Sequence, residues 1–231
     1  MPIVGHIEQT SQVVSMQFRR GNVPPSKANF AFLRQCEAAL PAGVSVNRLR
    51  IDAAGYQHAI LDYAIDRQIA FAIRAKLSQS CRRQILGLSE SAWQSFVHRD
   101  GRVSSHQQTC RLVHMMQEST HPFTLVVQRT PKTGQQSIEL LSSEAVELIE
   151  ANGYVYRAIA TNRDELSDSE VIHWYNQRGE HSENRIKELK LDFAGDALPC
   201  SEFKANELYF ALCGLAYNLF VLMKYKKFQL F

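Results

Sequence analysis

The stretch from Val44 to Lys76 constrains the possible folds more than any other part of the sequence. Residues 44–52 alternate apolar and polar side chains and predict a strand, residues 56–67 have a helical pattern, and residues 69–76 predict a second strand. Strand, helix and strand within about 30 residues form a βαβ unit, which implies parallel strands joined by a right-handed crossover. The sequence therefore predicts an α/β fold.

Asp52 is the last residue of the first predicted strand and is followed by the small residues Ala53, Ala54 and Gly55. In open α/β sheets the carboxyl ends of parallel strands are where functional groups gather, which makes Asp52 a candidate catalytic or metal-binding carboxylate. An aspartate in this place is equally expected as a helix N-cap or turn residue. The two interpretations stay open at this point.

The segment from Glu170 to Lys190, EVIHWYNQRGEHSENRIKELK, is predicted to be one helix. At 100° per residue its apolar side chains Tyr175, Ile186 and Leu189 fall within about 60° of one another, so they predict a single buried stripe. Gly179 is the weak point of this interpretation, because a glycine inside a helix costs about 1 kcal/mol and can mark a kink.

Polar groups border this predicted stripe. Glu183 and Lys190 lie two turns apart on one flank, Arg178 lies on the other, and Glu180 points away from the stripe. A carboxylate with two cations can hold a metal ion and the phosphates around it. The same residues also fit an ordinary solvated helix face with Glu183 and Lys187 as an i,i+4 pair.

Three predicted regions follow from composition: a first α/β part (residues 1–77), a β-rich insertion (78–165) and a helical C-terminal part (166–231). Polar connectors separate short strand-like runs in the middle region. These runs are residues 123–128, 138–141 and 154–160.

The two ends of the chain also have readable patterns. Residues 11–18 predict a strand and residues 26–40 a helix that stops at Pro41. The segment 203–227 is apolar nearly all round and predicts one long buried helix. Its apolar run at 210–223 is too short to span a bilayer, which favours a core helix and predicts no membrane association.

Composition excludes several classes of protein. The 231 residues carry a net charge of +3, so no global basic field indicates nucleic acid. The five cysteines contain no CxxC pair, which argues against a zinc ribbon or a disulfide framework and fits a reducing cytoplasm. The histidines of the middle region lack HxxxH or HExxH spacing and predict surface or hydrogen-bonded side chains rather than a metal site. These histidines are His98, His106, His114 and His121.

Taken together, three stretches resemble the DDE-domain group 1 transposases of bacterial insertion sequences, of the IS-thirteen-eighty type. The first is PIVGHIEQTSQVV with QFRRGNVPP, the second is LRIDAAGYQ, and the third is YNQRGEHSENRIKELK followed by FKANELYFALCGLAYNL. The third stretch is similar to the Tyr-Arg-Glu-Lys signature of the wider superfamily. Its interval from Arg178 to Glu183 is one residue longer than in the commonest form, which leaves a choice between Glu183 and Glu180; the helical geometry favours Glu183.

The resemblance implies an RNase H-like α/β core with a β-rich insertion before the last catalytic helix. It also implies DNA transposition by metal-dependent phosphoryl transfer, with Mg²⁺ (or Mn²⁺) held by three carboxylates. Asp52 would be the second of these and Glu183 the third. Arg178 and Lys190 would bind backbone phosphates, while Tyr175 would pack and orient the helix at the DNA site.

The resemblance also implies the partners: DNA with the terminal inverted repeats, target DNA, and a second copy in a synaptic complex in the bacterial cytoplasm, near the nucleoid. The family's first aspartate belongs to a strand upstream of PIVGH, and before Asp52 the only acids are Glu8 and Glu37. We therefore expect a truncated form that lacks this aspartate and the N-terminal DNA-binding region. The alternative expectation is a catalytically dead fragment that binds DNA or a transposase partner.

Overall fold

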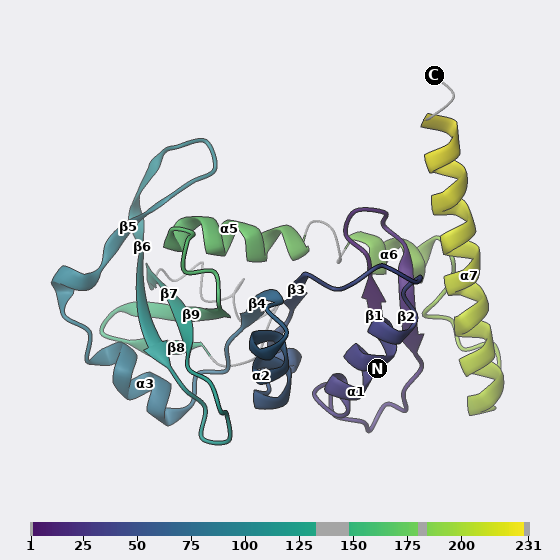
Figure 1. Cartoon of the computed structure of the whole chain (residues 1–231), viewed down its shortest axis with the longest axis horizontal. Helices are drawn as coiled ribbons and strands as arrows, with labels where there is room; N and C mark the ends of the chain where they lie inside the picture. The colour runs from purple at the N-terminus through teal and green to yellow at the C-terminus, as the bar shows by residue number, and fades with distance from the viewer. Residues whose placement is uncertain (1, 133–147, 180–183, 229–231) are drawn as a thin grey trace. The chain divides into compact units, whose positions relative to one another are not determined.

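The computed structural model describes residues 2–132, 148–179 and 184–228 (Figure 1). The chain divides into two units. Unit 1 comprises residues 1–45 and 177–231, and unit 2 comprises residues 46–176. The predicted strand at 138–141 and the acids Glu180 and Glu183 lie outside the described residues.

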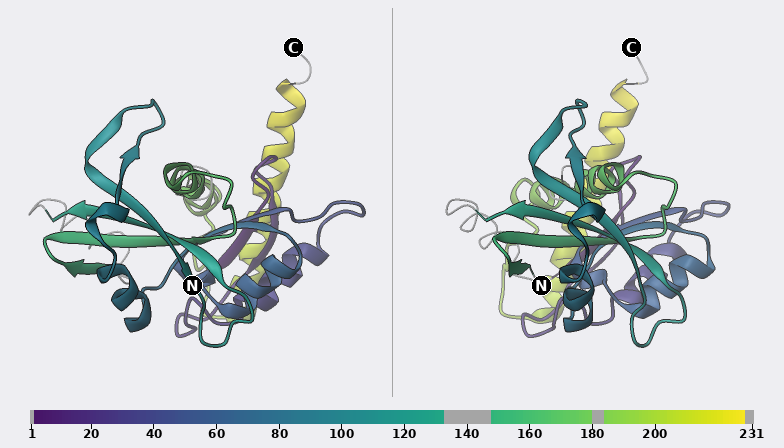
Figure 2. Two further views of the ribbon diagram at one scale, coloured as in Figure 1. Left: turned by 60° about the vertical axis from the view of Figure 1, so that its left-hand side comes forward. Right: turned by 90° about the vertical axis from the view of Figure 1, so that its left-hand side faces the viewer.

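Unit 2 is built on a seven-stranded mixed sheet with the strand order β3-β4-β9-β7-β6-β5, and β8 also pairs with β9. The strands β3 and β4 are parallel, and the other described pairs are antiparallel. The β5–β6 hairpin projects beyond the rest of the sheet (Figure 2). The strands are β3 (Arg48–Ile51), β4 (Ala70–Arg74), β5 (Gln94–Val97), β6 (Val103–His114), β7 (Phe123–Pro131), β8 (Ile149–Ala151) and β9 (Tyr154–Thr161).

The predicted βαβ unit is confirmed. Strand β3 runs parallel to β4, with Arg48 opposite Ala70 and Ile51 opposite Ile73, and helix α2 (His58–Asp66) joins them. The first strand is shorter than the predicted 44–52. The last bond toward β4 on this side is the one from the Ala70 N–H to the Asn47 oxygen at 3.1 Å, so the residues before Asn47 lie beyond the pairing with β4.

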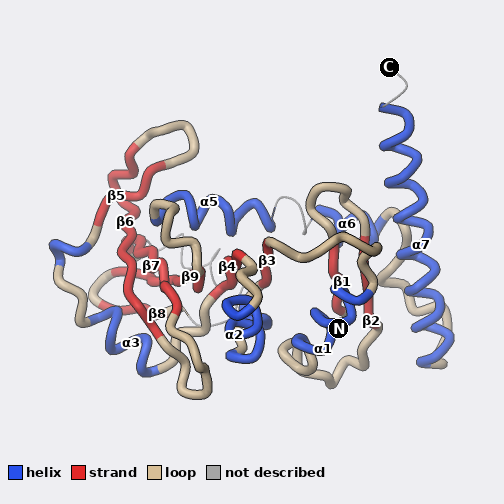
Figure 3. The backbone as a smooth tube through the Cα atoms, in the orientation of Figure 1, coloured by secondary structure: helices blue, strands red, loops and turns tan. Residues whose placement is uncertain are grey.

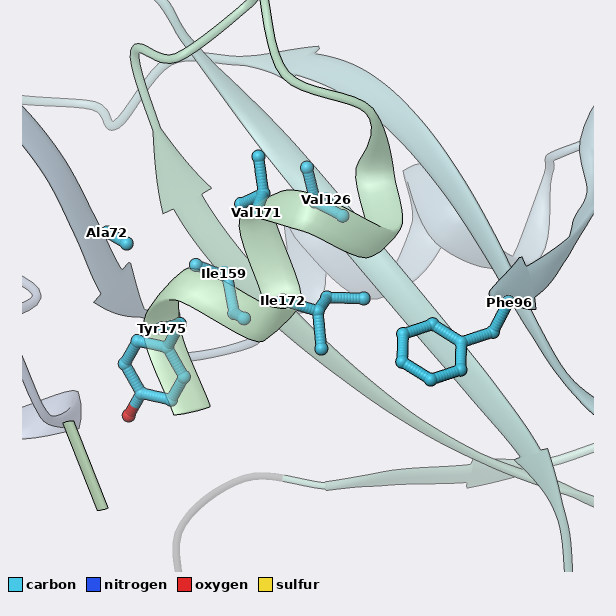
Figure 4. Close-up of a cluster of buried hydrophobic side chains, with 7 residues drawn as sticks. All are labelled: Ala72, Phe96, Val126, Ile159, Val171, Ile172 and Tyr175. Atoms are coloured by element: carbon cyan, nitrogen blue, oxygen red, sulfur yellow. The ribbon is translucent and has the colours of Figure 1, made fainter. Parts of the chain in front are cut away.

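Two helices cover opposite faces of this sheet (Figure 1). Helix α5 (Asp168–Arg178) buries Val171, Ile172 and Tyr175 against the sheet, while α2 buries its own apolar face on the other side. Figure 4 shows the cluster under α5. The sheet residues of that cluster are Ala72, Phe96, Val126 and Ile159. The remaining helical elements of unit 2 are the 3-10 turn η1 (Ala53–Gly55), α3 (Gln79–Leu86) and η2 (Glu90–Ala92).

Unit 1 is smaller. The strands β1 (Ile3–His6) and β2 (Val13–Gln17) form an antiparallel two-stranded sheet, accompanied by α1 (Asn29–Ala38), α6 (Asn184–Leu191) and α7 (Phe203–Phe228). Its core joins both parts of the chain. The buried residues of this core are Val13, Leu189, Phe210, Cys213, Tyr217 and Val221.

The prediction of one buried stripe over residues 170–190 is wrong. Helix α5 ends at Arg178, Gly179 continues it as a π-helical residue, and α6 begins at Asn184 (Figure 3). Residues 180–183 lie outside the described residues, so one continuous helix stays a prediction. Tyr175 and Leu189 are both buried, but Tyr175 belongs to the core of unit 2 and Leu189 to that of unit 1. The helical projection placed both residues on one stripe because it does not include the packing of each residue in a different unit.

The prediction that the last helix is buried all round is also wrong. One face of α7 lies in the core of unit 1, whereas leucines on another face are more than half exposed, Leu208 by 62% and Leu212 by 54%. By length and composition alone, Phe203–Lys224 could cross a membrane, and 33% of that window is buried. Since a core helix passes the same test, this single helix is weak evidence for a membrane span.

Candidate active site

Asp52 lies at the carboxyl end of β3, as the N-cap of the turn η1. Its Oδ1 accepts a hydrogen bond from the backbone N–H of Ala54 at 3.0 Å, and its side chain is exposed. The turn depends on Gly55, because a Cβ there would lie 2.3 Å from Cγ2 of Ile51. The interpretation of Asp52 as a capping residue is thus confirmed, and its Oδ2 takes no part in that bond, so capping does not occupy the whole carboxylate.

Arg50 ties the last turns of α5 to the end of β3. Its Nη1 donates to the backbone oxygen of Trp174 at 2.8 Å, and its guanidinium carbon lies 5.9 Å from the centre of the Trp174 ring. The Arg163 guanidinium carbon lies 5.1 Å from the same ring. Because Arg50 precedes Asp52 by two residues, these contacts place the carboxyl end of β3 beside the C-terminal turns of α5.

Helix α5 is fixed at its start as well. Ser167 and Glu170 form a capping box, in which Ser167 donates its backbone N–H and its hydroxyl to Glu170 Oε2 at 2.8 and 2.7 Å. Arg111 Nε donates to Asp168 Oδ1 at 2.7 Å. Farther along the helix, His173 Nε2 lies 2.8 Å from the backbone oxygen of Val97. Contacts at its first, middle and last turns therefore give α5 a defined position on the sheet.

Tyr175 packs in the core between α5 and the sheet and is only 6% exposed. In Figure 4 its ring lies at the edge of the cluster, with the hydroxyl pointing away from the other labelled side chains. The ring therefore serves to seat the helix.

The other predicted site residues are placed less completely. Arg178 is the last residue of α5 and Lys190 lies in the last turn of α6, and both are half-buried. Glu183 and its alternative Glu180 lie outside the described residues. Among the described residues no group of three or more His, Cys, Asp or Glu side chains could hold a metal ion. The meeting of Asp52 with Glu183 remains a prediction.

The sequence analysis missed His6, a half-buried histidine whose ring nitrogens are buried near Arg185 of α6. Both ring nitrogens of His6 are buried and have no hydrogen-bond partner in the described structure. Burial and the nearby positive charge of Arg185 lower the pKa of His6 from 6.5 to about 4, so the ring is neutral at pH 7. Arg185 in turn donates to the backbone oxygens of Ile7 and Glu8 at 3.5 and 3.4 Å. The sequence feature that could have indicated a partly buried His6 is its position at the end of the apolar strand β1.

Cys81 and His114 form a second buried polar pair that sequence spacing did not reveal. Cys81 Sγ lies 3.2 Å from His114 Nε2, and His114 Nδ1 lies 2.8 Å from Gln84 Oε1. Burial lowers the pKa of His114. His114 is thus a hydrogen-bonded histidine, as predicted. Because Cys81 is 0% exposed, the pair is structural in this conformation.

The chain was compared with curated proteins and with models of protein families. A search among curated proteins finds no match to the chain. A family model described as "Transposase DDE domain group 1" matches residues 1–230, nearly the whole chain. The mixed α/β architecture with its mixed sheet is consistent with such a domain. The chain belongs to the DDE-domain group 1 transposase family.

Proposed function

We propose that this chain acts in DNA transposition of the IS-thirteen-eighty type, by cleaving and joining DNA strands at insertion-sequence ends from an RNase H-like core. One observation carries the proposal. The hydrogen bond from Arg50 to Trp174 holds the end of β3, and with it Asp52, beside the helix whose chain continues toward Glu183.

Asp52 and Glu183 would be the metal-binding and catalytic carboxylates. The Oδ2 of the exposed Asp52, which the Ala54 bond does not use, is the hard oxygen donor that Mg²⁺ or Mn²⁺ prefers, so this residue suits the group that the family generally uses. Bound divalent ions supply activation of a water or 3′-hydroxyl and stabilisation of the leaving oxygen. The residues of the chain would position the metal ligand. The Ala54 N–H fixes one oxygen of Asp52, and Gly55 permits the turn that leaves the other oxygen exposed.

Arg178 and Lys190 would bind the backbone phosphates next to the cut. A guanidinium offers a fork of two hydrogen bonds to a phosphate, whereas an ammonium acts as a point charge. Tyr175, fixed in the core, would orient α5 rather than react. If these roles are correct, replacing Lys190 by Ala weakens binding to all DNA sequences alike and lowers the salt dependence of log Kd by about one unit.

The partners in this proposal are the terminal inverted repeats, target DNA and a second copy in a synaptic complex. Members of the family are typically cytoplasmic, and DNA as substrate would bring this chain to the nucleoid.

The test is incubation of the purified chain with Mg²⁺ or Mn²⁺ and DNA carrying the matching inverted repeats, with Mn²⁺ affinity measured in parallel by calorimetry. We expect Asp52→Asn and Glu183→Gln each to lower DNA cleavage by more than about 100-fold and Mn²⁺ affinity by at least about tenfold. The metal readout keeps the test decisive if the chain needs further protein for turnover.

Asp100→Asn is a matched control. Asp100 is exposed and its Oδ1 accepts the backbone N–H of Arg102 at 3.1 Å, the same type of turn as at Asp52. We expect this variant to behave like the wild type. Cleavage and Mn²⁺ binding that survive both Asp52→Asn and Glu183→Gln would refute the site. Salt-sensitive DNA binding without cleavage or Mn²⁺ binding would instead support the alternative of a binding fragment.

A further inference from the structure

Arg74 is a buried arginine at the carboxyl end of β4. It is the last residue of that strand and is only 7% exposed. No residue in the described part of the chain forms an ion pair or a hydrogen bond with its guanidinium. Arginines are rarely buried without a partner, because a charge that leaves water unpaired is strongly unfavourable. The side chain therefore needs an anionic partner that the described chain does not supply.

The register of the parallel strands β3 and β4 places Arg74 beside Asp52. Ile51 lies opposite Ile73. Asp52 continues β3 with extended backbone angles, φ −70° and ψ −174°, so the next step along both strands brings Asp52 and Arg74 side by side. Neighbouring strands lie about 4.8 Å apart. Within the described residues the two side chains form no ion pair, which leaves the guanidinium available for a third group.

Both side chains lie on the face of the sheet that α5 covers. Since side chains alternate along a strand, Arg74 shares the face of Ala72, which belongs to the cluster under α5. Asp52 likewise shares the face of Arg50, which donates to a backbone oxygen of that helix. In Figure 4 the strand that carries Ala72, β4, ends beside the Tyr175 ring. The cation and the carboxylate therefore lie together beside the C-terminal turns of α5.

Three half-buried arginines on the same face of the sheet each have a partner within the chain. These pairs are Arg50 with the Trp174 oxygen at 2.8 Å, Arg111 with Asp168 at 2.7 Å and Arg157 with Gln128 at 2.6 Å. Their donors hold α5 and the neighbouring strands in place. Arg74 is more deeply buried than these three and has no such role among the described residues.

A guanidinium beside a metal-binding carboxylate suits a phosphate. It can donate two parallel N–H groups to two phosphate oxygens, which a carboxylate cannot do. In phosphoryl transfer the negative charge of the transition state lies on the non-bridging oxygens, and donors fixed in advance stabilise it. Burial fixes the stem of Arg74 before a ligand binds, so little side-chain ordering remains to be done on binding.

We propose that Arg74 binds the DNA phosphate that is cut, by donating N–H groups to its non-bridging oxygens next to the carboxylate of Asp52. The inference rests on the proposed function, which gives Arg178 and Lys190 the phosphates beside the cut and leaves the cut phosphate itself without a side-chain donor. Arg74 stays protonated throughout and forms no covalent bond, because a guanidinium does not lose its proton in a protein.

The experiment compares two DNA duplexes that carry the matching terminal repeat. One is ordinary DNA, and the other has a neutral methylphosphonate in place of the phosphate at the cut. Binding of the full chain to each is measured by fluorescence anisotropy without metal, so that no cleavage occurs. We expect the wild type to bind the ordinary duplex about tenfold more tightly, because the charged hydrogen bonds to the phosphate are lost in the other. Arg74→Met should bind both duplexes alike or prefer the modified one.

Arg67→Met is the matched control. Arg67 is exposed at the C-terminal end of α2, just before the other end of β4, and its guanidinium carbon lies 5.3 Å from the centre of the Tyr63 ring. This variant should keep the wild-type preference for ordinary DNA. Arg74→Lys keeps the charge but not the fork, so we expect a preference between those of the wild type and Arg74→Met.

Two further measurements separate this inference from folding and from the proposed function. Arg74→Met removes a buried charge without a described partner, so it should melt no lower than the wild type; Arg74→Gln serves if the methionine prevents folding. In calorimetry Arg74→Met should bind Mn²⁺ at least as tightly as the wild type, whereas Asp52→Asn should lose at least about tenfold.

An equal preference for ordinary DNA in the wild type and in Arg74→Met would overturn the inference and leave the proposed function standing. A wild type that does not distinguish the two duplexes would overturn it as well. The Mn²⁺ affinity of Asp52→Asn then decides separately whether the proposed metal site fails too, since that measurement does not depend on Arg74.

Discussion

The two units of the chain differ in how completely they bury their apolar surface. In unit 2 a seven-stranded sheet lies between helices, and Phe71, Leu125 and Ala160 are 0% exposed. In unit 1 a two-stranded sheet packs on one face of α7, while Leu208 and Leu212 on its other face are more than half exposed. A two-stranded hairpin is only marginally stable without a partner, so the hairpin of unit 1 depends on its packing against α7.

This difference separates two kinds of apolar residue. Leu125 of unit 2 is part of the folding core, whereas Leu212 on the outer face of α7 is more than half exposed. Both tryptophans, Trp93 and Trp174, lie in unit 2, so tryptophan fluorescence follows that unit. Far-UV circular dichroism also reports the helical content of α7 in unit 1, so the two signals together compare the unfolding of the two units.

The largest expected effect comes from the core of unit 2. Leu125→Ala removes a fully buried side chain from β7 and should cost about 2–5 kcal/mol of unfolding free energy. Leu212→Ala, on the outer face of α7, should cost less than about 1 kcal/mol. Denaturant unfolding followed by fluorescence and circular dichroism measures both. Equal losses would show that Leu212 is a core position.

A smaller effect is expected from acid in unit 1. Unfolded His6 takes up a proton near pH 6.5, whereas folded His6 does so only near pH 4. Between these values the unfolded state binds more protons, so stability falls as the pH falls from 6.5 to 4, by about 3 kcal/mol in total.

The His6→Leu variant isolates this contribution. It should lose that part of the pH dependence, whereas His106→Leu, an exposed residue on β6 of unit 2, should keep it. Unfolding curves from pH 7 to 4, read by circular dichroism, provide the measurement. A His6→Leu profile as steep as that of the wild type would contradict the assignment.

A still smaller effect is expected where α7 holds β2. The side-chain amide of Asn218 accepts the backbone N–H of Val13 and donates to its backbone oxygen, both at 2.8 Å. Asn218→Ala removes both bonds and should cost about 2 kcal/mol. Asn22→Ala, an exposed residue of the same unit, is the control and should be neutral. A neutral Asn218→Ala would mean that apolar packing alone holds the hairpin on α7.

Local patterns predicted the fold where neighbours in sequence are also neighbours in space. The β3-α2-β4 unit is such a case, as is β9, which was expected at 154–160 and occupies Tyr154–Thr161. The exposed face of α7 could not be predicted, because a helix that is apolar all round does not specify which face is covered. The burial of Tyr175 and Leu189 in two different cores was missed because it depends on packing with residues distant in sequence.

The site was predicted only in part for a similar reason. Asp52 was identified because its position at a strand end follows from local pattern, and the structure places it there. The Arg50–Trp174 contact, which brings α5 to that strand end, joins residues 124 apart in sequence and leaves no trace in spacing. His6 was missed because its burial depends on packing with the distant Arg185.

The most direct test of the proposed site is a crystal of the chain soaked in Mn²⁺, with the metal located by its anomalous scattering. We predict a peak bound by the carboxylates of both Asp52 and Glu183, with metal–oxygen distances within ~2.5 Å. A peak that touches neither carboxylate, or Asp52 and Glu183 on different surfaces of the folded chain, would contradict the proposed chemistry.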